Sequence, residues 1–450
     1  MKLFIKSFKM TNKQALLVIL LSAIAYYLFG YTTPRTDFNK VFTYYSLLFI
    51  GFGLLYKCSN LSIRWLIIGG IIFRFILLFA IPNLSDDFYR FLWDGRAIAK
   101  GINPYLILPQ NNPELISNGI ELYKGMGNMN GSHFTCYPPL NQFAFTIPAI
   151  ISENGIFIST IMMRLTLIIA DIITVYFGLK ILKILNIDKR KILLYFINPF
   201  IIIELTGNLH YEGMMIAFLS ASIYYLLKNK NHLSASLWAC AVSIKLIPLL
   251  FIPLLYKKLG FKNLFIYGTI VLGINAILFI PFLSQNLVNN FMSSIELYFQ
   301  NFEFNASIYY VVREIGFWIK GYNIIGLVGK TTPFIIIVIT ILISIIRKNN
   351  KTVTLFTSML FLIISYYLLA SVVHPWYIAI PLFLSIFTKY NFAVVWSFTI
   401  ILSYSAYINT NYKENLWLVF LEYFIVIIFF IIEFNQAKTS AEIKHSKLPY

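Results

Sequence analysis

The sequence is poor in charged residues and has few cysteines. Asp, Glu, Lys and Arg make up 12% of its 450 residues, whereas soluble domains carry about 25%. Hydrophobic residues make up 59%, above the roughly 45–50% of soluble domains. This composition excludes an ordinary water-soluble protein.

The three cysteines, Cys58, Cys136 and Cys240, lie far apart in the sequence. They form neither a CxxC pair nor a Cys/His spacing typical of zinc sites. We therefore expect no disulfide framework, no metal site and no cofactor.

Apolar runs recur along nearly the whole chain, and no polar linker divides it into domains. A membrane-spanning helix needs about 20 apolar residues. Candidate spans cover residues 14–31, 41–56, 65–82, 155–179, 192–206, 214–227, 261–284, 321–345, 353–371, 376–388, 392–409 and 416–433. The pattern predicts an all-α polytopic integral membrane protein with about 12–14 transmembrane helices. Residues 1–433 would form one domain, followed by a mobile cytoplasmic tail, 434–450.

Two further apolar runs fit a straight span less well. The run 233–256 carries Lys245 in its middle and two prolines after it, which favours a broken or re-entrant segment as much as a span. The run 138–152 is short and begins with two prolines. We expect it to form a helix at the membrane interface.

The basic residues predict the orientation in the membrane. Lys and Arg number 36, against 18 Asp and Glu. Most of the basic residues fall on one side of the predicted spans, among them Lys2, Lys6, Lys9 and Lys13. The positive-inside rule places this side in the cytoplasm. We attribute the basic excess to orientation in the inner (plasma) membrane and expect no nucleic-acid partner.

A long loop, residues 83–137, lies on the opposite, outer side. Loops without structure are uncommon beyond about 12–15 residues. We therefore expect the long loop to be functional and partly folded, and take residues 83–140 as the candidate catalytic loop.

The long loop opens with the sequence SDDFYRFLWDGR, residues 85–96. On a helix, Arg90 lies one turn from both Asp86 and Asp94, while Asp87 and Asp94 are one heptad apart. Adjacent carboxylates near an arginine can supply a general base beside an anionic phosphate. The same pattern is typical of a solvated ion-pair face in which Ser85 and Asp86 cap the helix.

Asn103 and Tyr105 belong to the sequence GINPY, residues 101–105. Gly and Asn-Pro are ordinary turn residues. From the residues alone, we expect this segment to shape the loop rather than to react.

Ionisable residues interrupt the apolar runs further along the chain. Such residues in a membrane protein indicate a functional site by default. Those on the outer side are Glu204, His210, Glu212 and His374, and Lys245 lies inside an apolar run. His210 and Glu212 are two residues apart, which makes a poor metal motif, so hydrogen bonding to a polar substrate is the simpler role.

Arg74, Arg164 and Asp171 also lie inside apolar runs. Arg164 and Asp171 are seven residues apart, two turns along one helix face. We expect them to form a structural ion pair within the membrane.

Two classes of function fit these residues. The first is a membrane enzyme that acts at the outer face on a lipid-linked anionic substrate. The second is a secondary transporter or a lipid-linked sugar flippase, which would hold its charges near the midplane between repeated halves. The reactive residues gather on one side and no repeat is visible, which favours the enzyme.

Six motifs in order carry a family resemblance. They are SDDxYRxxWDGR (85–96), GxNPY (101–105), YPPL (137–140), GNxHxE (207–212), SIKLIP (243–248) and HPWY (374–377). In this order and spacing the chain resembles the bacterial polyprenyl-phosphate-mannose-dependent mannosyltransferases of the GT-C superfamily.

The resemblance implies a polytopic helical fold whose outer loop carries juxtamembrane helices and an essential Asp. It implies transfer of a hexose, mannose in this family, from a polyprenyl-phosphate donor to a glycan or glycolipid acceptor, with inversion. It places the general base at Asp86 or Asp87, with Asp86 favoured.

The resemblance also implies the binding residues. Candidates for neutralising the phosphate are Arg90, Arg96, Lys245 and His374, and further substrate-binding candidates are Asp94, Asn103, Tyr105, His210 and Glu212. The family motif often carries Asp where this chain has Glu212, one methylene longer, so the role of Glu212 is open.

Overall fold

The computed structural model describes residues 7–409 and 411–446, and within them the regular secondary structure is helical apart from two isolated bridges, Phe8 with Cys58 and Phe304 with Val372. Lys2 and Lys6 of the predicted cytoplasmic cluster lie outside the described residues. The prediction of an all-helical membrane protein is confirmed.

Seven helices in the described part of the chain are long and apolar enough to cross a membrane. They are α1 (Asn12–Thr32), α2 (Phe38–Lys57), α7 (Ile156–Ile184), the continuous segment Ile247–Phe282, α14 (Ile325–Ile346), α15 (Thr352–Leu369) and the first part of α18 (Leu416–Ser446). The segment Ile247–Phe282 comprises η5 (Ile247–Leu255), α11 (Tyr256–Phe279) and η6 (Ile280–Phe282). The protein is therefore a multi-pass membrane protein.

The other expected spans, and the run 233–256, form shorter or interrupted helices. They are α3 (Ile63–Ile76), η3 (Lys189–Ile192), α8 (Leu193–Phe196), the π-helix η4 (Ile201–Gly207), α9 (Glu212–Leu227), α10 (Asn231–Ile244), η7 (Pro375–Ile378), α16 (Ala379–Ser385), α17 (Phe392–Thr399) and η8 (Ile400–Ile408). Local breakers explain part of the difference, since Pro disrupts the helical hydrogen-bond ladder. For example, α8 ends just before Asn198 and Pro199.

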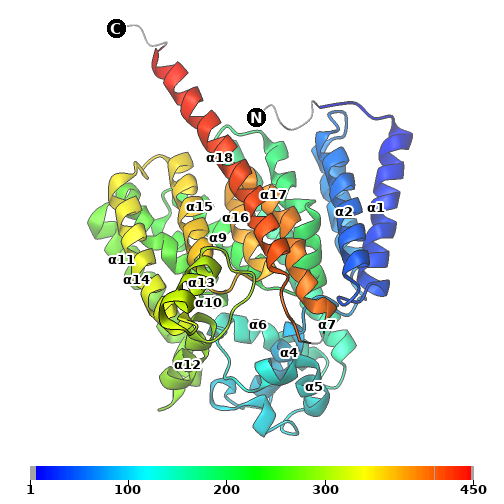
Figure 1. Ribbon diagram of the computed structural model, residues 1–450, viewed down its shortest axis with the longest axis vertical. Helices are drawn as coiled ribbons and strands as arrows, with labels where there is room; N and C mark the ends of the chain where they lie inside the picture. The colour runs from blue at the N-terminus through cyan, green and yellow to red at the C-terminus, as the bar shows by residue number, and fades with distance from the viewer. Residues whose placement is uncertain (1–6, 410, 447–450) are drawn as a thin grey trace.

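The long loop is folded, as predicted. It contains α4 (Asp87–Ala99), η1 (Pro104–Leu106), η2 (Pro109–Asn111) and α5 (Gly119–Gly131), and α6 (Pro139–Ile151) follows it. These helices and α12 (Leu287–Gln300) form a layer at one end of the bundle, opposite to the end at which α18 projects (Figure 1). α18 continues as a helix past residue 434, where we expected a mobile tail to begin.

Glycine allows α4 to pack closely on α6. A Cβ atom at Gly95 would overlap the backbone carbonyl of Phe145. Next to this contact, the rings of Phe91 and Phe145 stack with centroids 4.5 Å apart. The glycine of the motif therefore has a packing role.

The buried charges pair differently from our expectation. Asp171 pairs with Arg74 of α3, Nε to Oδ2 at 2.7 Å, instead of with Arg164. Arg164 donates instead to the carbonyls of Leu78, Thr206 and Gly207 at 2.7–3.0 Å. Helices distant in the sequence supply these partners, which the spacing along one helix could not reveal.

The run 233–256 is broken, one of the two forms we expected. α10 ends at Ile244, Lys245 has extended backbone angles (φ −146°, ψ 141°), and the 3-10 helix η5 follows with Pro248 and Pro253. The break places the Lys245 side chain at the end of α10, beside the folded long loop.

Candidate active site

A cavity of about 870 Å³ lies between the folded long loop and the helical bundle. It brings together five of the predicted site residues, Asp86, Asp87, Glu212, Lys245 and His374. They come from four separate parts of the chain: the start of α4, the start of α9, the break after α10 and the segment before η7.

Asp86 forms an ion pair with Arg35, Oδ2 to Nη2 at 2.5 Å. Arg35 also lies over the ring of Tyr407, 4.9 Å from its centroid, and both residues line the cavity. Asp86 occupies the N-cap position of α4 without making a side-chain cap hydrogen bond. The Asp87 N–H instead donates to Ser85 Oγ at 3.3 Å, so of the two expected caps only Ser85 accepts a hydrogen bond.

Asp87 is half-buried at the start of α4. Burial raises the pKa of its carboxyl to about 6, although Lys245 and a hydrogen bond from Asn130 act in the opposite direction. The Asn130 Nδ2 donates to Asp87 Oδ1 at 3.4 Å. A carboxylate with a raised pKa binds protons more strongly than an ordinary Asp.

Lys245 forms an ion pair with Glu212 on the bundle side of the cavity. Glu212 is buried, and its Oε2 has no hydrogen-bond partner within the described residues. The Lys245 ammonium also lies 5.8 Å and 5.9 Å from the ring centroids of Tyr137 and Tyr377. One cation and one unpaired acceptor atom thus lie close together at this end of the cavity.

His374 lines the cavity between aromatic rings. It stacks on Trp376 with ring centroids 4.5 Å apart and lies 5.4 Å from Phe304. Burial, and to a lesser extent Lys245, lowers the pKa of His374 to about 3. The imidazole is therefore neutral at pH 7, which favours hydrogen bonding over the charge neutralisation we expected of it.

His210 lies behind this wall and does not line the cavity. Its ring stacks on Trp376, which also stacks on His374, with the His210 and Trp376 centroids 3.7 Å apart. The His210 Nε2 is 3.9 Å from Glu204 Oε2. His210 therefore supports a cavity wall.

Arg90, Asp94 and Arg96 lie inside the folded loop and do not line the cavity. Arg90 pairs with Asp94 at 2.8 Å, as its spacing predicted, and donates to the carbonyls of Asn130 and His133. Arg96 donates to the carbonyl of Ser117 at 2.7 Å. The two arginines thus hold α4 against the two ends of α5.

Asn103 and Tyr105 also lie outside the cavity lining. Asn103 Nδ2 donates to the carbonyl of Phe282 at 2.9 Å, and the Tyr105 hydroxyl donates to the carbonyl of Tyr137 at 2.6 Å. These contacts tie the loop to η6 and to the cavity rim, in keeping with the shaping role read from the residues.

The cavity also has an apolar wall. It is formed by the segment after Lys245 and by the middle of α14, namely Leu246, Ile247, Leu249, Leu250, Pro333, Ile336 and Ile337. The charged groups and this wall share one cavity, so the site can hold a ligand that is polar at one end and apolar at the other.

The sequence did not point to several cavity residues. Arg35 comes from the short connection between α1 and α2, Phe302 to Phe304 from the connection after α12, and Tyr407 from η8. Only tertiary contacts bring these short segments to the long loop. The lone Arg35 on the outer side was the one available signal.

We found no group of three or more His, Cys, Asp or Glu that could hold a metal ion in residues 7–409 and 411–446. The cationic side chains that line the cavity are Arg35 and Lys245.

The helical bundle, the folded long loop and the cavity between them define a multi-pass membrane protein with a candidate active site at one end of the bundle. Residues 41–258 match the family described as "Alpha-(1->6)-mannopyranosyltransferase, N-terminal domain". This match includes the long loop, Glu212 and Lys245, and it confirms the resemblance to bacterial mannosyltransferases.

Two relatives carry the name alpha-(1->6)-mannopyranosyltransferase A. The protein of Mycobacterium tuberculosis is 22% identical over 170 residues, which cover 38% of this chain and 32% of the relative. That of Corynebacterium glutamicum is 25% identical over 170 residues, which cover 38% of this chain and 34% of the relative. The aligned region thus spans about a third of the length of each relative.

Proposed function

We propose that this chain is a membrane glycosyltransferase that transfers a hexose from a polyprenyl-phosphate donor to a glycan or glycolipid acceptor. The observation that carries the proposal is that two adjacent aspartates and a lysine lie beside an apolar wall in one cavity. The sugar phosphate would occupy the charged end, and the first part of the polyprenyl chain would lie along the wall formed by η5 and α14. The names of the relatives favour mannose and an α-(1→6) linkage.

The adjacent carboxylates supply the general base. In an inverting transfer, the base takes the proton of the acceptor hydroxyl while that oxygen attacks the anomeric carbon and the lipid phosphate departs. Arg35 pairs with Asp86, whereas burial raises the pKa of Asp87 to about 6. A base is most effective when its pKa lies near the working pH. We therefore assign the base to Asp87, although the resemblance favoured Asp86. The ion pair of Asp86 with Arg35 would hold the first turn of α4 in place.

Lys245 neutralises the departing phosphate. A phosphate leaving group requires stabilisation of its charge more than protonation. The Lys245 ammonium can exchange Glu212 for a phosphate oxygen or contact both. Glu212 would then accept a hydrogen bond from a sugar hydroxyl, which assigns a role to the longer side chain. Arg90 and Arg96 act indirectly, by holding the loop in shape.

The expected orientation completes the proposal. The cavity would open at the outer face of the plasma membrane, because the basic segments at the other end of the bundle favour a cytoplasmic position.

A donor panel tests the function. Purified protein in nanodiscs would receive polyprenyl-phosphate mannose, glucose and galactose, and released polyprenyl phosphate and elongated acceptor would be measured together. We expect release coupled to transfer, fastest with mannose. Movement of the intact donor between leaflets of proteoliposomes without release would show the alternative, a flippase.

A further inference from the structure

α13 (Ile308–Lys320) is a short helix whose two faces differ sharply. Tyr309, Tyr310 and Gly316 are buried. A stripe of large apolar side chains on the other side is exposed, and the Trp318 side chain is 84% exposed. The stripe comprises Ile308, Val311, Ile315, Trp318 and Ile319, which recur at helical spacing.

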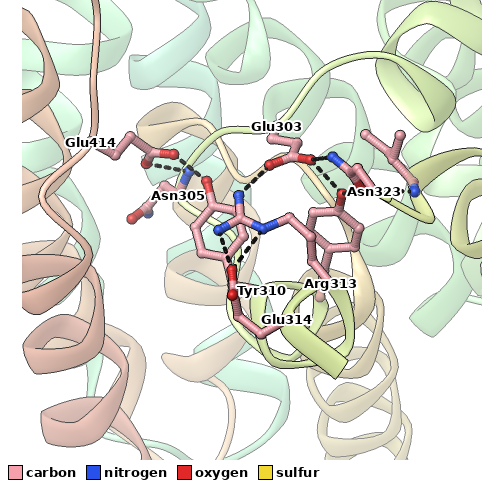
Figure 2. Close-up of polar contacts among 9 residues, drawn as sticks. Glu303, Asn305, Tyr310, Arg313, Glu314, Asn323 and Glu414 are labelled. Carbon is pink, nitrogen blue, oxygen red and sulfur yellow. Dashed lines mark hydrogen bonds and ion pairs between the residues drawn. The ribbon is translucent and has the colours of Figure 1, made fainter. Parts of the chain in front are cut away.

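A polar network holds the inner face of α13 (Figure 2). Arg313 Nη1 donates to Glu303 Oε2 at 2.6 Å, and the Tyr309 hydroxyl donates to the same carboxylate. The Tyr310 hydroxyl donates to Glu414. Because these contacts fix the rotation of the helix about its axis, the apolar stripe cannot turn toward the protein.

The length of α13 excludes a membrane span. Its 13 residues extend over about 20 Å at 1.5 Å per residue, against a hydrocarbon core of about 30 Å. α13 packs beside α15, near the long-loop end of the bundle (Figure 1). The exposed apolar surface continues directly after it through Tyr322 and Leu327 into α14, a membrane-spanning helix.

We propose that α13 is a membrane-surface helix whose apolar stripe lies in the leaflet on the long-loop side. Amphipathic helices with a polar face fixed to protein lie in the plane of the interface, and Trp and Tyr favour the level of the lipid headgroups. Continuity with the lipid-facing surface of α14 makes the bilayer the occupant of the stripe, ahead of a second copy or a soluble partner. This surface does not depend on the proposed function.

The docked helix anchors one wall of the cavity. Glu303, which α13 holds, lies between Phe302 and Phe304, and all three line the cavity. The Phe304 N–H donates to the carbonyl of Ser371 at 3.0 Å, and the Val373 N–H donates to the carbonyl of Phe304 at 2.8 Å. The depth of α13 in the membrane therefore positions residues 302–304, which form the cavity wall next to His374.

Spin-label accessibility in nanodiscs tests the proposal. Single cysteines would replace Val311, Ile315, Trp318 or Ile319 in the full chain, with Glu314→Cys as the exposed polar control on the same helix. The unmutated protein, labelled identically, supplies the background from its native cysteines. We expect the ratio of collision with oxygen to collision with a water-soluble nickel chelate to be about threefold higher at the stripe than at position 314.

Two results would overturn the proposal. Equal access of the nickel chelate to the stripe and to position 314 would place the stripe in water. Access of neither reagent, with immobilised labels, would show a protein partner or a second copy on the stripe. Quenching of tryptophan fluorescence by brominated lipids gives an independent measurement without cysteine variants. The amount of fluorescence that these lipids quench should be smaller in Trp318→Phe than in the parent protein, and an equal amount would contradict the proposal.

Discussion

Asp86 and Asp87 are adjacent in the sequence but lie in different chemical surroundings. Arg35 pairs with Asp86, while the burial of Asp87 raises its pKa to about 6. Only an ionised carboxylate can accept the proton of an acceptor hydroxyl. The pH dependence of the reaction therefore reports on which carboxylate acts.

If Asp87 is the base, kcat/KM should be constant above about pH 7 and fall below pH 6. Each pH unit below the pKa then lowers the fraction of ionised Asp87 about tenfold. Transfer rates measured from pH 4.5 to 8 at low donor concentration would check this. A profile that stays flat down to pH 4.5 would point to a carboxylate of ordinary acidity and away from Asp87.

Variants of the Lys245 and Glu212 ion pair can distinguish a role in stability from a role in donor binding. Lys245→Met leaves a buried, unpaired Glu212 carboxylate, which should cost about 3–5 kcal/mol of stability. In the double variant Lys245→Met/Glu212→Gln, most of this stability should return, because no unpaired charge remains. Thermal unfolding in detergent would measure it.

The KM for the donor should behave differently. It should stay raised by at least about tenfold in the double variant, because the double variant still lacks the lysine that meets the phosphate. If the double variant recovered both stability and a normal KM, Lys245 would have only a structural role.

The structure brings together those predicted site residues that violate the membrane pattern. Asp86, Asp87, Glu212, Lys245 and His374 all line the cavity, and each interrupts or flanks an apolar run. Arg90 and Arg96 carry the same charge but face carbonyl groups inside the loop. Composition and spacing do not specify which way such a side chain points, because that depends on packing between α4 and its neighbours.

At the scale of the helices, the close packing of α4 on α6 controls the shape of the long loop. The Cβ of Gly95→Ala would overlap the Phe145 carbonyl, and such overpacking costs about 1–3 kcal/mol. We expect lower thermal stability and a loss of transfer, because α4 carries Asp87. Gly53→Ala on helix α2 is the matched control, since a Cβ at this position would have no atom of the described protein within 4 Å. Equal stability of the two variants would contradict the packing role of Gly95.

Long, uninterrupted spans were the elements that the sequence predicted best. α1, α2, α7, α14 and α15 lie within a few residues of their expected ranges. The expected span 192–206 instead contains α8, Asn198-Pro199 and the π-helix η4. A count of apolar residues cannot distinguish a continuous span from a broken one, because both bury hydrophobic side chains. The π-helix η4 also depends on partners such as Arg164 from another helix.

At the scale of the whole molecule, the layer that bounds the cavity lies at one end of the bundle (Figure 1). This asymmetry agrees with an enzyme acting at one membrane face. A transporter site would instead lie near the midplane between repeated halves.

The proposed reaction depends on the protein's own charges, so chelation should leave it intact. We expect transfer to retain nearly all of its rate in excess EDTA, since Arg35 and Lys245 supply the positive charge in the cavity. The same assay with added Mg²⁺ or Mn²⁺ is the control. Loss of transfer in EDTA that a divalent ion restores would contradict this prediction.

The central claim is that a carboxylate at the start of α4 removes a proton during transfer of a sugar from a polyprenyl-phosphate donor. Single-turnover transfer by the wild-type protein, Asp86→Asn and Asp87→Asn, with donor binding measured in parallel, tests it most directly. We predict that Asp87→Asn binds the donor but transfers about 10²–10⁴ times more slowly, with a smaller loss in Asp86→Asn. A large loss only in Asp86→Asn would move the base to that residue, and near-normal turnover in both variants would contradict the claim.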